Sequence, residues 1–325
     1  MTQTIWNPHT EMHNAITQNG GFVNCHAHFD KSFYINKEGL YTTMKLSMKE
    51  KWHISDELKR NSSQADIEGR IRMALDVMVA QGIKLTCSFV DAYEAVDHKA
   101  IDAALKVRDE YADKIRFVIA TQPLGGLVDP KAQKLYEEIT AKADIAGGLP
   151  SKDRPHDDEN YDILFSIAKN LNKPLHVHID QENDITERDT EKLINTTIKY
   201  GYQGRVVALH VISVSAQPKQ YRTEIYKKMK DAGISVVVCP GAALSMKQPD
   251  QISPTHNCLA NVAEMMEAGL VIGLGCDNIH DYYQPFIDGD MWTELRMLAE
   301  ACRYYDFDEL VKIATINGEK ILNTR

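Results

Sequence analysis

Eight short apolar runs alternate with stretches of helical periodicity along most of the chain, and this alternation restricts the fold more than any other feature. The runs cover residues 22–25, 83–90, 115–121, 144–149, 174–179, 205–210, 234–239 and 271–276. The helical stretches cover residues 63–81, 97–112, 130–143, 160–172, 184–200, 221–232, 261–268, 291–304 and 307–322. Strands separated by helices must pair in parallel, because each helix carries the chain back along the sheet.

The runs are apolar throughout, which is typical of strands that are covered on both faces. Eight such units in 325 residues fit a closed (β/α)₈ barrel, the TIM barrel, better than an open doubly wound sheet. No Gly-x-Gly-x-x-Gly follows the first run, so the main sign of a dinucleotide-binding sheet is absent. No linker or low-complexity tract interrupts the pattern, and we expect residues 1–325 to form one α/β domain.

Charge and composition argue against two classes of partner. The formal net charge is -9, with acidic and basic residues interspersed, so the sequence offers no basic stripe for nucleic acid and no polybasic segment for lipid. The chain starts without a signal-peptide pattern, and no apolar stretch reaches the roughly 18 residues of a membrane helix. The six cysteines form no CxxC pair, which indicates reduced thiols and a cytoplasmic protein.

Polar side chains gather at the ends of the runs, where a TIM barrel places its functional groups. His26 and His28 follow the first run two residues apart, so both can face the barrel axis. Other runs end in His176 and His178, in His210 and in Asp277, and two more end near Asp91, Thr121 and Gln122. Apart from His176, this set gives three imidazole ligands, one carboxylate and one additional histidine, which suits a single Zn²⁺ or Fe²⁺ ion.

The remaining histidines and one long segment lie away from the ends of the apolar runs, apart from His280. We expect structural or surface positions for His9, His13, His53, His98, His156 and His256, which lack a partner at ligand spacing. His280 differs from them because it follows Asp277 at the same strand end. Residues 33–60, with Trp52 and several lysines, form a long excursion after the first run, and in a barrel this excursion would lie over the mouth as part of a lid.

Four segments make the sequence similar to a known family. They are HAHFDKSF at 26–33, LHVHIDQEN at 175–183, VVALH at 206–210 and GCDNIHDYYQPFIDGDM at 275–291. In this order they resemble the cytosine deaminase and N-isopropylammelide isopropylamidohydrolase branch of the amidohydrolase superfamily. The resemblance implies a mononuclear site in which His26, His28, His178 and Asp277 are the metal ligands and His210 lies beside the bound water. His176 would then lie one layer deeper, in the core.

Two features depart from that family. Its members usually carry a β-sandwich built largely from segments ahead of the HxH motif, whereas 25 residues precede His26, so we expect a barrel without the sandwich. Cytosine-type deaminases have a glutamate three residues after the strand-five ligand, and here that position is Gln181. A glutamine amide does not titrate, and Glu182 is one residue further along. The N-isopropylammelide branch also lacks that glutamate.

Together these features predict a metal-dependent hydrolase of a non-peptide C–N bond, in an amide, a cyclic amidine or an amino-substituted N-heterocycle. A metal-bound hydroxide would attack, with Asp277 as ligand and general base and His210 orienting the tetrahedral centre. Asp277 would return the proton to the leaving amine, with Glu182 as a second candidate. The expected substrate-binding residues are Lys31, Gln122, Asp180, Gln181, Asn278, His280 and Asp281.

Several alternatives stay open on the sequence. A nucleobase or pterin deaminase would release ammonia. A binuclear hydrolase would need a carboxylated lysine at the fourth strand, where the sequence offers Lys152, and would bind two metal ions rather than one. A non-catalytic metal-binding barrel is the alternative outside the enzymes. The sequence does not name the substrate, choose between zinc and iron, or decide whether the chain forms a homo-oligomer.

Overall fold

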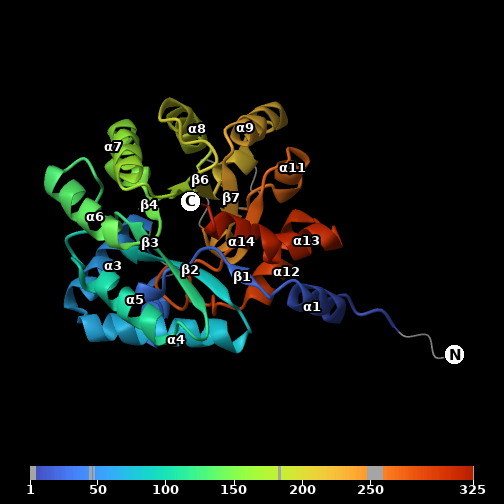
Figure 1. The fold of residues 1–325 in the computed structure, drawn as a ribbon, viewed down its shortest axis with the longest axis horizontal. Helices are drawn as coiled ribbons and strands as arrows, with labels where there is room; N and C mark the ends of the chain where they lie inside the picture. Colours follow the sequence, from blue (N-terminus) through green and yellow to red (C-terminus); the bar gives the residue numbers. More distant parts are fainter. Residues whose placement is uncertain (1–4, 44–45, 47, 182–183, 247–258, 325) are drawn as a thin grey trace.

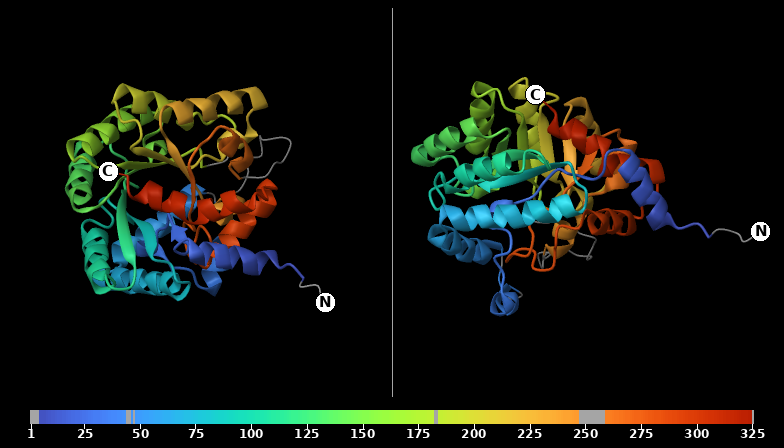
Figure 2. Two further views of the ribbon diagram at one scale, coloured as in Figure 1. Left: turned by 45° about the vertical axis from the view of Figure 1, so that its right-hand side comes forward. Right: turned by 60° about the horizontal axis from the view of Figure 1, so that its bottom comes forward.

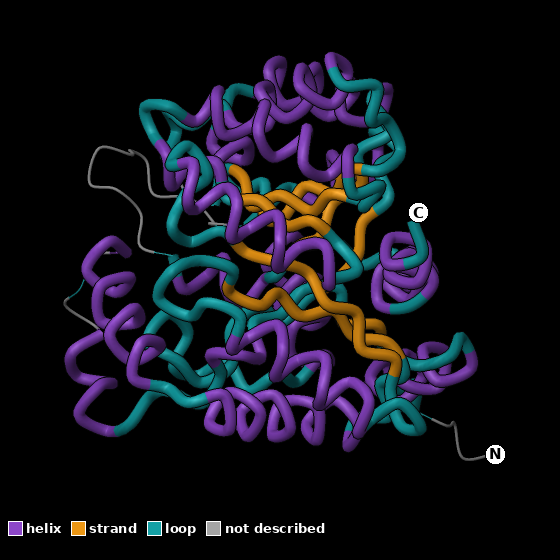
Figure 3. The backbone as a smooth tube through the Cα atoms, turned by 60° about the vertical axis from the view of Figure 1, so that its left-hand side comes forward, coloured by secondary structure: helices purple, strands orange, loops and turns teal. Residues whose placement is uncertain are grey.

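The computed structural model describes residues 5–43, 46, 48–181, 184–246 and 259–324. Within these residues, parallel strands form the interior and helices cover the outside (Figures 1 and 3). The strands are β1 (Val23–Asn24), β2 (Leu85–Asp91), β3 (Arg116–Gln122), β4 (Ala146–Gly148), β5 (Leu175–Ile179), β6 (Val206–His210), β7 (Ser235–Val238) and β8 (Ile272–Leu274). Each lies in or overlaps one of the eight apolar runs, although β1, β4 and β8 cover only half of their runs.

Hydrogen bonds close the strands into a ring. The pairs β1-β2-β3 and β4-β5-β6-β7-β8 are parallel throughout. A bridge between Ala120 and Ile145 joins β3 to β4. On the other side, the amide of Cys25 donates to the carbonyl of Leu274 at 2.8 Å, which joins β8 to β1. The predicted (β/α)₈ barrel is therefore confirmed.

The helices pack around this ring, and two departures from the predicted helix ranges are the largest. α8 begins at Asp189 rather than at residue 184, and Thr315, with φ -131° and ψ -97°, divides the predicted helix 307–322 in two. The helices are α4 (Gln64–Ala80), α5 (Lys99–Glu110), α6 (Pro130–Lys142), α7 (Asp157–Asn170), α8 (Asp189–Lys199), α9 (Lys219–Asp231), α10 (Pro240–Ser245), α11 (Val262–Glu267), α12 (Met291–Cys302), α13 (Phe307–Ala314) and α14 (Ile316–Leu322).

Capping residues explain where several helices start. Ser63 and Asp66 form a reciprocal capping box at the start of α4. Asp129 precedes Pro130, and its side chain accepts hydrogen bonds from the amides of Lys131 and Ala132, each at 2.9 Å, so α6 starts there.

Helices before α4 were not predicted from the sequence. α1 (Pro8–Gln18) buries Met12 and Ile16, too few apolar residues for a clear period, and packs beside α13 at the edge of the barrel (Figure 2). The excursion after β1 forms α2 (Lys37–Thr43) and α3 (Met48–Asn61). No helix among the described ranges is long and apolar enough to cross a membrane.

Two apolar layers surround the strands. Inside the barrel, Cys25, Cys87, Phe89, Leu209 and Val237 belong to one buried cluster, and a larger cluster lies between strands and helices. The described cysteines are free thiols, as the sequence predicted. Cys258 and His256 lie outside the described residues.

Candidate metal centre

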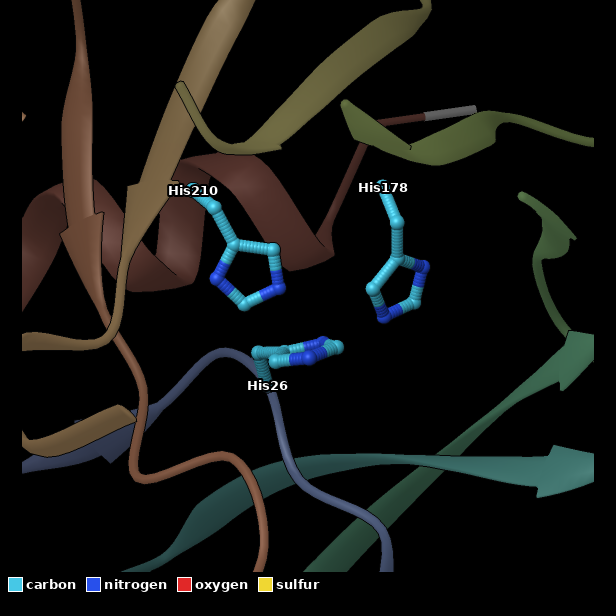
Figure 4. Close-up of side chains that lie close together, drawn as sticks. All are labelled: His26, His178 and His210. Atoms are coloured by element: carbon cyan, nitrogen blue, oxygen red, sulfur yellow. The ribbon is translucent and has the colours of Figure 1, made fainter. Parts of the chain in front are cut away.

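Five polar side chains from four strand ends meet at the carboxyl end of the barrel. The Nε2 atoms of His26 and His28 lie 3.5 and 3.2 Å from Oδ1 of Asp277. The Nε2 atom of His210 lies 3.9 Å from Oδ2 of the same carboxylate. The ring of His178 lies 4.9 Å from that of His26 and 5.4 Å from that of His210, and Figure 4 shows these three rings directed toward one another. Residues that are far apart in the sequence therefore form one cluster, which we call the metal cluster.

The backbone at the strand ends explains this convergence. Ala27 forms a bridge with Asp277, so His26 and His28 on either side of it face the same carboxylate. The Asn24 side chain accepts from the amides of His26 and Cys276, at 3.3 and 3.2 Å, and so ties the ends of β1 and β8 together. His210 and Asp277 adopt left-handed backbone conformations, with φ of 75° and 61°. This conformation turns the chain off the strand at the residue that carries the functional side chain.

Burial sets the charge state of the metal cluster. Burial, together with the nearby Lys31 cation, lowers the pKa of His28 to about 3, and burial lowers the pKa of His210 to about 4. Burial and the neighbouring His26 lower the pKa of His178 well below its usual value. Burial opposes ionisation of Asp277, but His26 and His28 beside it hold the pKa of its carboxyl well below the ordinary value. Neutral imidazoles and an ionised carboxylate are the forms that bind metal ions.

The unsatisfied atoms of the cluster test whether a metal ion fits. Both ring nitrogens of His26 and of His210, and Nε2 of His178, have no hydrogen-bond partner among the described residues. The other nitrogen of His178, Nδ1, lies 3.1 Å from the carbonyl of Gly148, which leaves Nε2 free as a ligand. Buried polar atoms without partners are costly, and a cation would satisfy them. Imidazoles with one carboxylate are a donor set for Zn²⁺ or Fe²⁺, so the residues fit a divalent metal.

A second buried polar cluster lies beside the first, and we call it the ion-pair cluster. The Nζ atom of Lys31 lies 3.0 Å from Oδ1 of Asp91 and 2.8 Å from Oε1 of Gln122. The Nζ atom of Lys59, which α3 provides, lies 2.6 Å from Oδ2 of Asp91. Asp30 accepts from the amide of Asp91 at 2.9 Å. Burial opposes ionisation of Asp91, but the two lysines hold its pKa below the ordinary value, so the charges of this cluster compensate one another.

A cavity opens onto both clusters. Of the predicted substrate-binding residues, it is lined by Lys31, Gln122, Gln181 and Asn278. Trp52 of α3 also lines the cavity, so this part of the excursion at 33–60 lies at the mouth. The remaining lining residues are His28, Leu124, Leu149, His178, His210, Met246, Asp277, Tyr283 and Gln284.

Three predicted substrate contacts are placed elsewhere, and the predicted catalytic residue Glu182 lies outside the described residues. Asp180 accepts from the amides of Asp189 and Thr190, at 3.0 and 3.1 Å, and so caps α8. Asp281 accepts from the Asn278 side chain and from two backbone amides of its own loop. His280 has Nδ1 3.0 Å from the carbonyl of Pro285. None of the three is among the residues lining the cavity in the described chain, and Glu182 lies outside the description.

Sequence reasoning missed three residues of the site. The Gln284 amide donates to Oδ2 of Asp277 at 3.1 Å, and Lys59 completes the ion-pair cluster. Cys239 follows β7, and its sulfur, a ring nitrogen of His210 and a carboxylate oxygen of Asp277 all lie within 4.8 Å of one another. The sequence contained a signal for Cys239, since it ends the seventh run as the other site residues end theirs. Gln284 and Lys59 lie in loop and helix, where no strand position marks them.

Two other residues received specific predictions. His176 is fully buried one layer below His178, as expected for a core position. The centre of its ring lies 6.4 Å from the centre of the Phe89 ring. Lys152, the residue that a binuclear site would need, places its ammonium 3.7 Å from the centre of the Trp52 ring. It is not among the described residues that line the cavity, and its ammonium lies against the Trp52 ring, so the arrangement does not favour a bridging role for it.

Comparison with known proteins assigns the family. Residues 20–325 match the amidohydrolase family. This chain belongs to it. An uncharacterized Haemophilus influenzae protein is 35% identical to this amidohydrolase over 260 residues, 79% of this chain and 94% of that protein. The N-isopropylammelide isopropyl amidohydrolase of a Pseudomonas species is 28% identical over 276 residues, 83% of this chain and 65% of that enzyme, so the match spans just under two thirds of its length.

A solved structure supports the fold of this amidohydrolase. The 5-methylcytosine deaminase from Klebsiella pneumoniae, liganded with 5-fluorocytosine, is similar with a TM-score of 0.84 at 22% identity, over 93% of this chain and 74% of that one. This likeness confirms the barrel. Membership of the amidohydrolase family confirms the predicted class, a metal-dependent hydrolase of C–N bonds other than peptide bonds.

Proposed function

We propose that this amidohydrolase holds one divalent ion, Zn²⁺ or Fe²⁺, between His26, His28, His178 and Asp277, and hydrolyses a C–N bond of a small amide, cyclic amidine or amino-substituted N-heterocycle. One observation carries the proposal: these side chains converge from three strand ends, while both ring nitrogens of His26 and Nε2 of His178 are buried without a hydrogen-bond partner among the described residues. The Asp277 carboxylate, which has no ion pair with a lysine or arginine of the described residues, completes the donor set.

The two carboxylate oxygens of Asp277 have different surroundings, so each would have its own role in the reaction. A divalent ion at this position supplies Lewis acidity and makes water nucleophilic at neutral pH. Oδ1 faces His26 and His28 and would be the ligand atom. Oδ2 accepts from the Gln284 amide, which fixes its direction, and this oxygen would take the proton of the attacking water.

His210 and Asp277 would complete the reaction. The Nε2 atom of His210 lies 3.9 Å from Oδ2 of Asp277, and as a neutral imidazole its N–H can donate to the oxygen that gains charge at the attacked carbon. Asp277 then returns the proton from Oδ2 to the leaving nitrogen. Glu182 is a second candidate for that proton transfer. A buried imidazole keeps its neutral form over the whole physiological pH range.

The cavity favours a planar ring substrate. Leu124, Leu149 and Met246 supply apolar surface, and Trp52 and Tyr283 supply aromatic surface. Lys31, Gln122, Gln181 and Asn278 add donors and acceptors at the edge, which is how sites select planar heterocycles. Asp281 would act indirectly, by orienting the Asn278 amide, and Asp180 and His280 by holding their loops.

A deaminase is the second candidate, because the same groups serve when the leaving nitrogen is ammonia. The presence of Gln181, which cannot titrate, at the position of the deaminase glutamate favours an amine other than ammonia as the leaving group. We further propose a cytoplasmic location, since the buried cysteines are free thiols.

The test combines metal analysis with a product screen. The purified protein should contain one equivalent of zinc or iron per chain, and it should release amine or ammonia from a panel of amino- and alkylamino-substituted triazines, pyrimidines and pterins. Full activity in a metal-free preparation would contradict the proposal. If the protein releases ammonia and Glu182→Gln abolishes this release, Glu182 rather than Asp277 would be the residue that transfers the proton to the leaving nitrogen. That result would favour the deaminase.

A further inference from the structure

We propose a second, inhibitory metal site in the same mouth, formed by His210, Cys239 and Asp277, which takes a thiophilic divalent ion such as Zn²⁺ or Cd²⁺. The inference rests on the proposed function, because both sites share Asp277. The candidate ligand atoms of the three residues lie within 4.8 Å of one another, and all three side chains are buried. They come from the ends of β6, β7 and β8, three neighbouring strands.

The position of Cys239 makes its sulfur available to this site. Its side chain faces the barrel interior, where it packs in the same buried cluster as Leu209 and Val237. A side chain on Gly275 would meet the Cys239 sulfur at 3.0 Å and the Cβ of His26 at 2.8 Å. The glycine therefore leaves the space in which the sulfur approaches the metal cluster.

The carboxylate of Asp277 is arranged to serve two ions. Oδ1 lies 3.5 and 3.2 Å from the Nε2 atoms of His26 and His28, whereas Oδ2 lies 3.9 Å from that of His210. Neither ring nitrogen of His210, which is 2% exposed, has a hydrogen-bond partner in the part of the chain that the structure describes. A buried imidazole without a partner, close to a carboxylate oxygen and a thiol, points to a cation between them.

The donor set selects the kind of ion. A thiol that becomes a thiolate on binding favours zinc and cadmium over magnesium, calcium and manganese, and its proton leaves to solvent. An ion in this site would engage both Oδ2 of Asp277 and Nε2 of His210. These are the atoms that the proposed reaction needs for proton transfer, so excess zinc or cadmium should inhibit hydrolysis.

Cadmium titration of the protein carrying one metal equivalent tests the inference. The wild type should bind a second equivalent with a cadmium–thiolate charge-transfer band in the ultraviolet, and activity should fall in parallel. Cys239→Ser should lose the band and require about tenfold or more cadmium for half-inhibition, each variant being compared with its own activity before titration. Cys87→Ser is the matched control, because Cys87 is buried in the same interior cluster and belongs to no ligand group among the described residues.

The outcomes separate this site from the first. A band retained in Cys239→Ser, or no second equivalent in an active wild type, would overturn the second site and leave the proposed function intact. Absence of the first equivalent together with activity would overturn both. If Cys239→Ser does not fold by circular dichroism, Cys239→Ala provides the same comparison.

Discussion

The metal cluster and the ion-pair cluster lie side by side in one barrel mouth and are equally buried, yet different groups surround their carboxylates. In the ion-pair cluster, Lys31 and Lys59 neutralise Asp91 at 3.0 and 2.6 Å. In the metal cluster, ring nitrogens of His26, His178 and His210 have no partner among the described residues. Burial without partners does not by itself identify a ligand site, since both ring nitrogens of the core residue His176 also lack partners among the described residues. The convergence of several such nitrogens on one carboxylate does.

The largest effect should come from removing one ligand of the metal cluster. His178→Ala should lose bound metal and lower kcat/KM by about 10³-fold or more, because the Lewis acid contributes several kcal/mol to the transition state. Metal analysis and steady-state kinetics would measure both. His176→Ala, on the same strand and one layer deeper, should keep the metal while its cavity lowers the free energy of unfolding by about 2 to 3 kcal/mol. Equal metal loss in both variants would contradict the distinction.

Breaking the ion-pair cluster should affect stability rather than metal binding. Asp91→Ala leaves two buried lysines without their shared partner, so the free energy of unfolding should fall by about 3 to 5 kcal/mol, measured by urea denaturation. Metal content should stay at the wild-type value. Asp158→Ala is the control, because its pair with Lys192 is largely exposed and should contribute at most about 1 kcal/mol. Metal loss in Asp91→Ala would show that metal binding depends on the ion-pair cluster, and would contradict the distinction between the two clusters.

The buried carboxyl of Glu294 extends the comparison, because no lysine or arginine of the described residues forms an ion pair with it, as Lys31 and Lys59 do with Asp91. Burial, together with the nearby Asp277, raises the pKa of Glu294 to about 8, and its carboxyl accepts from the Gly241 amide at 2.8 Å. The folded state keeps this proton up to about pH 8, whereas the unfolded chain loses it near its ordinary pKa. The stabilisation is therefore complete at low pH and is lost as the pH rises through about 8.

Replacing Glu294 by glutamine should remove this pH dependence. Between pH 5 and pH 8 the free energy of unfolding of the wild type should fall by about 3 kcal/mol more than that of Glu294→Gln, measured by denaturation at both pH values. Glu57→Gln, at an exposed position of α3, should follow the wild type. An identical pH dependence in wild type and Glu294→Gln would show that the carboxyl is already ionised when folded.

The smallest effect should come from Lys152, the residue on which a binuclear site would depend. Lys152→Met removes the contact with the Trp52 ring and should cost about 1 kcal/mol of stability. The metal content of protein purified without excess metal should remain one equivalent per chain. A fall from two equivalents to one would establish the binuclear alternative instead.

The sequence could predict the barrel and the members of the metal cluster, because both follow from strand periodicity. His26, His28, His178, His210 and Asp277 end apolar runs, and parallel strands bring their ends together. Lys59 and Gln284 could not be found in this way, since a helix and a loop place them. Asp180 and Asp281 sit at strand ends or beside them but bind backbone amides, a choice that depends on loop geometry rather than on sequence position.

The left-handed backbone at Asp180, His210 and Asp277 limits how this mouth can change. Histidine, aspartate, asparagine and glycine tolerate such a conformation, whereas a valine, isoleucine or threonine there would cost about 1 to 2 kcal/mol. A library that randomises these three positions should therefore return few β-branched residues even when selected for folding alone. In this barrel, His210 and Asp277 both turn the backbone at a strand end and supply functional groups, so a substitution there changes both. New activities should therefore be easier to reach by substitutions in the lid and the loops than at the strand ends.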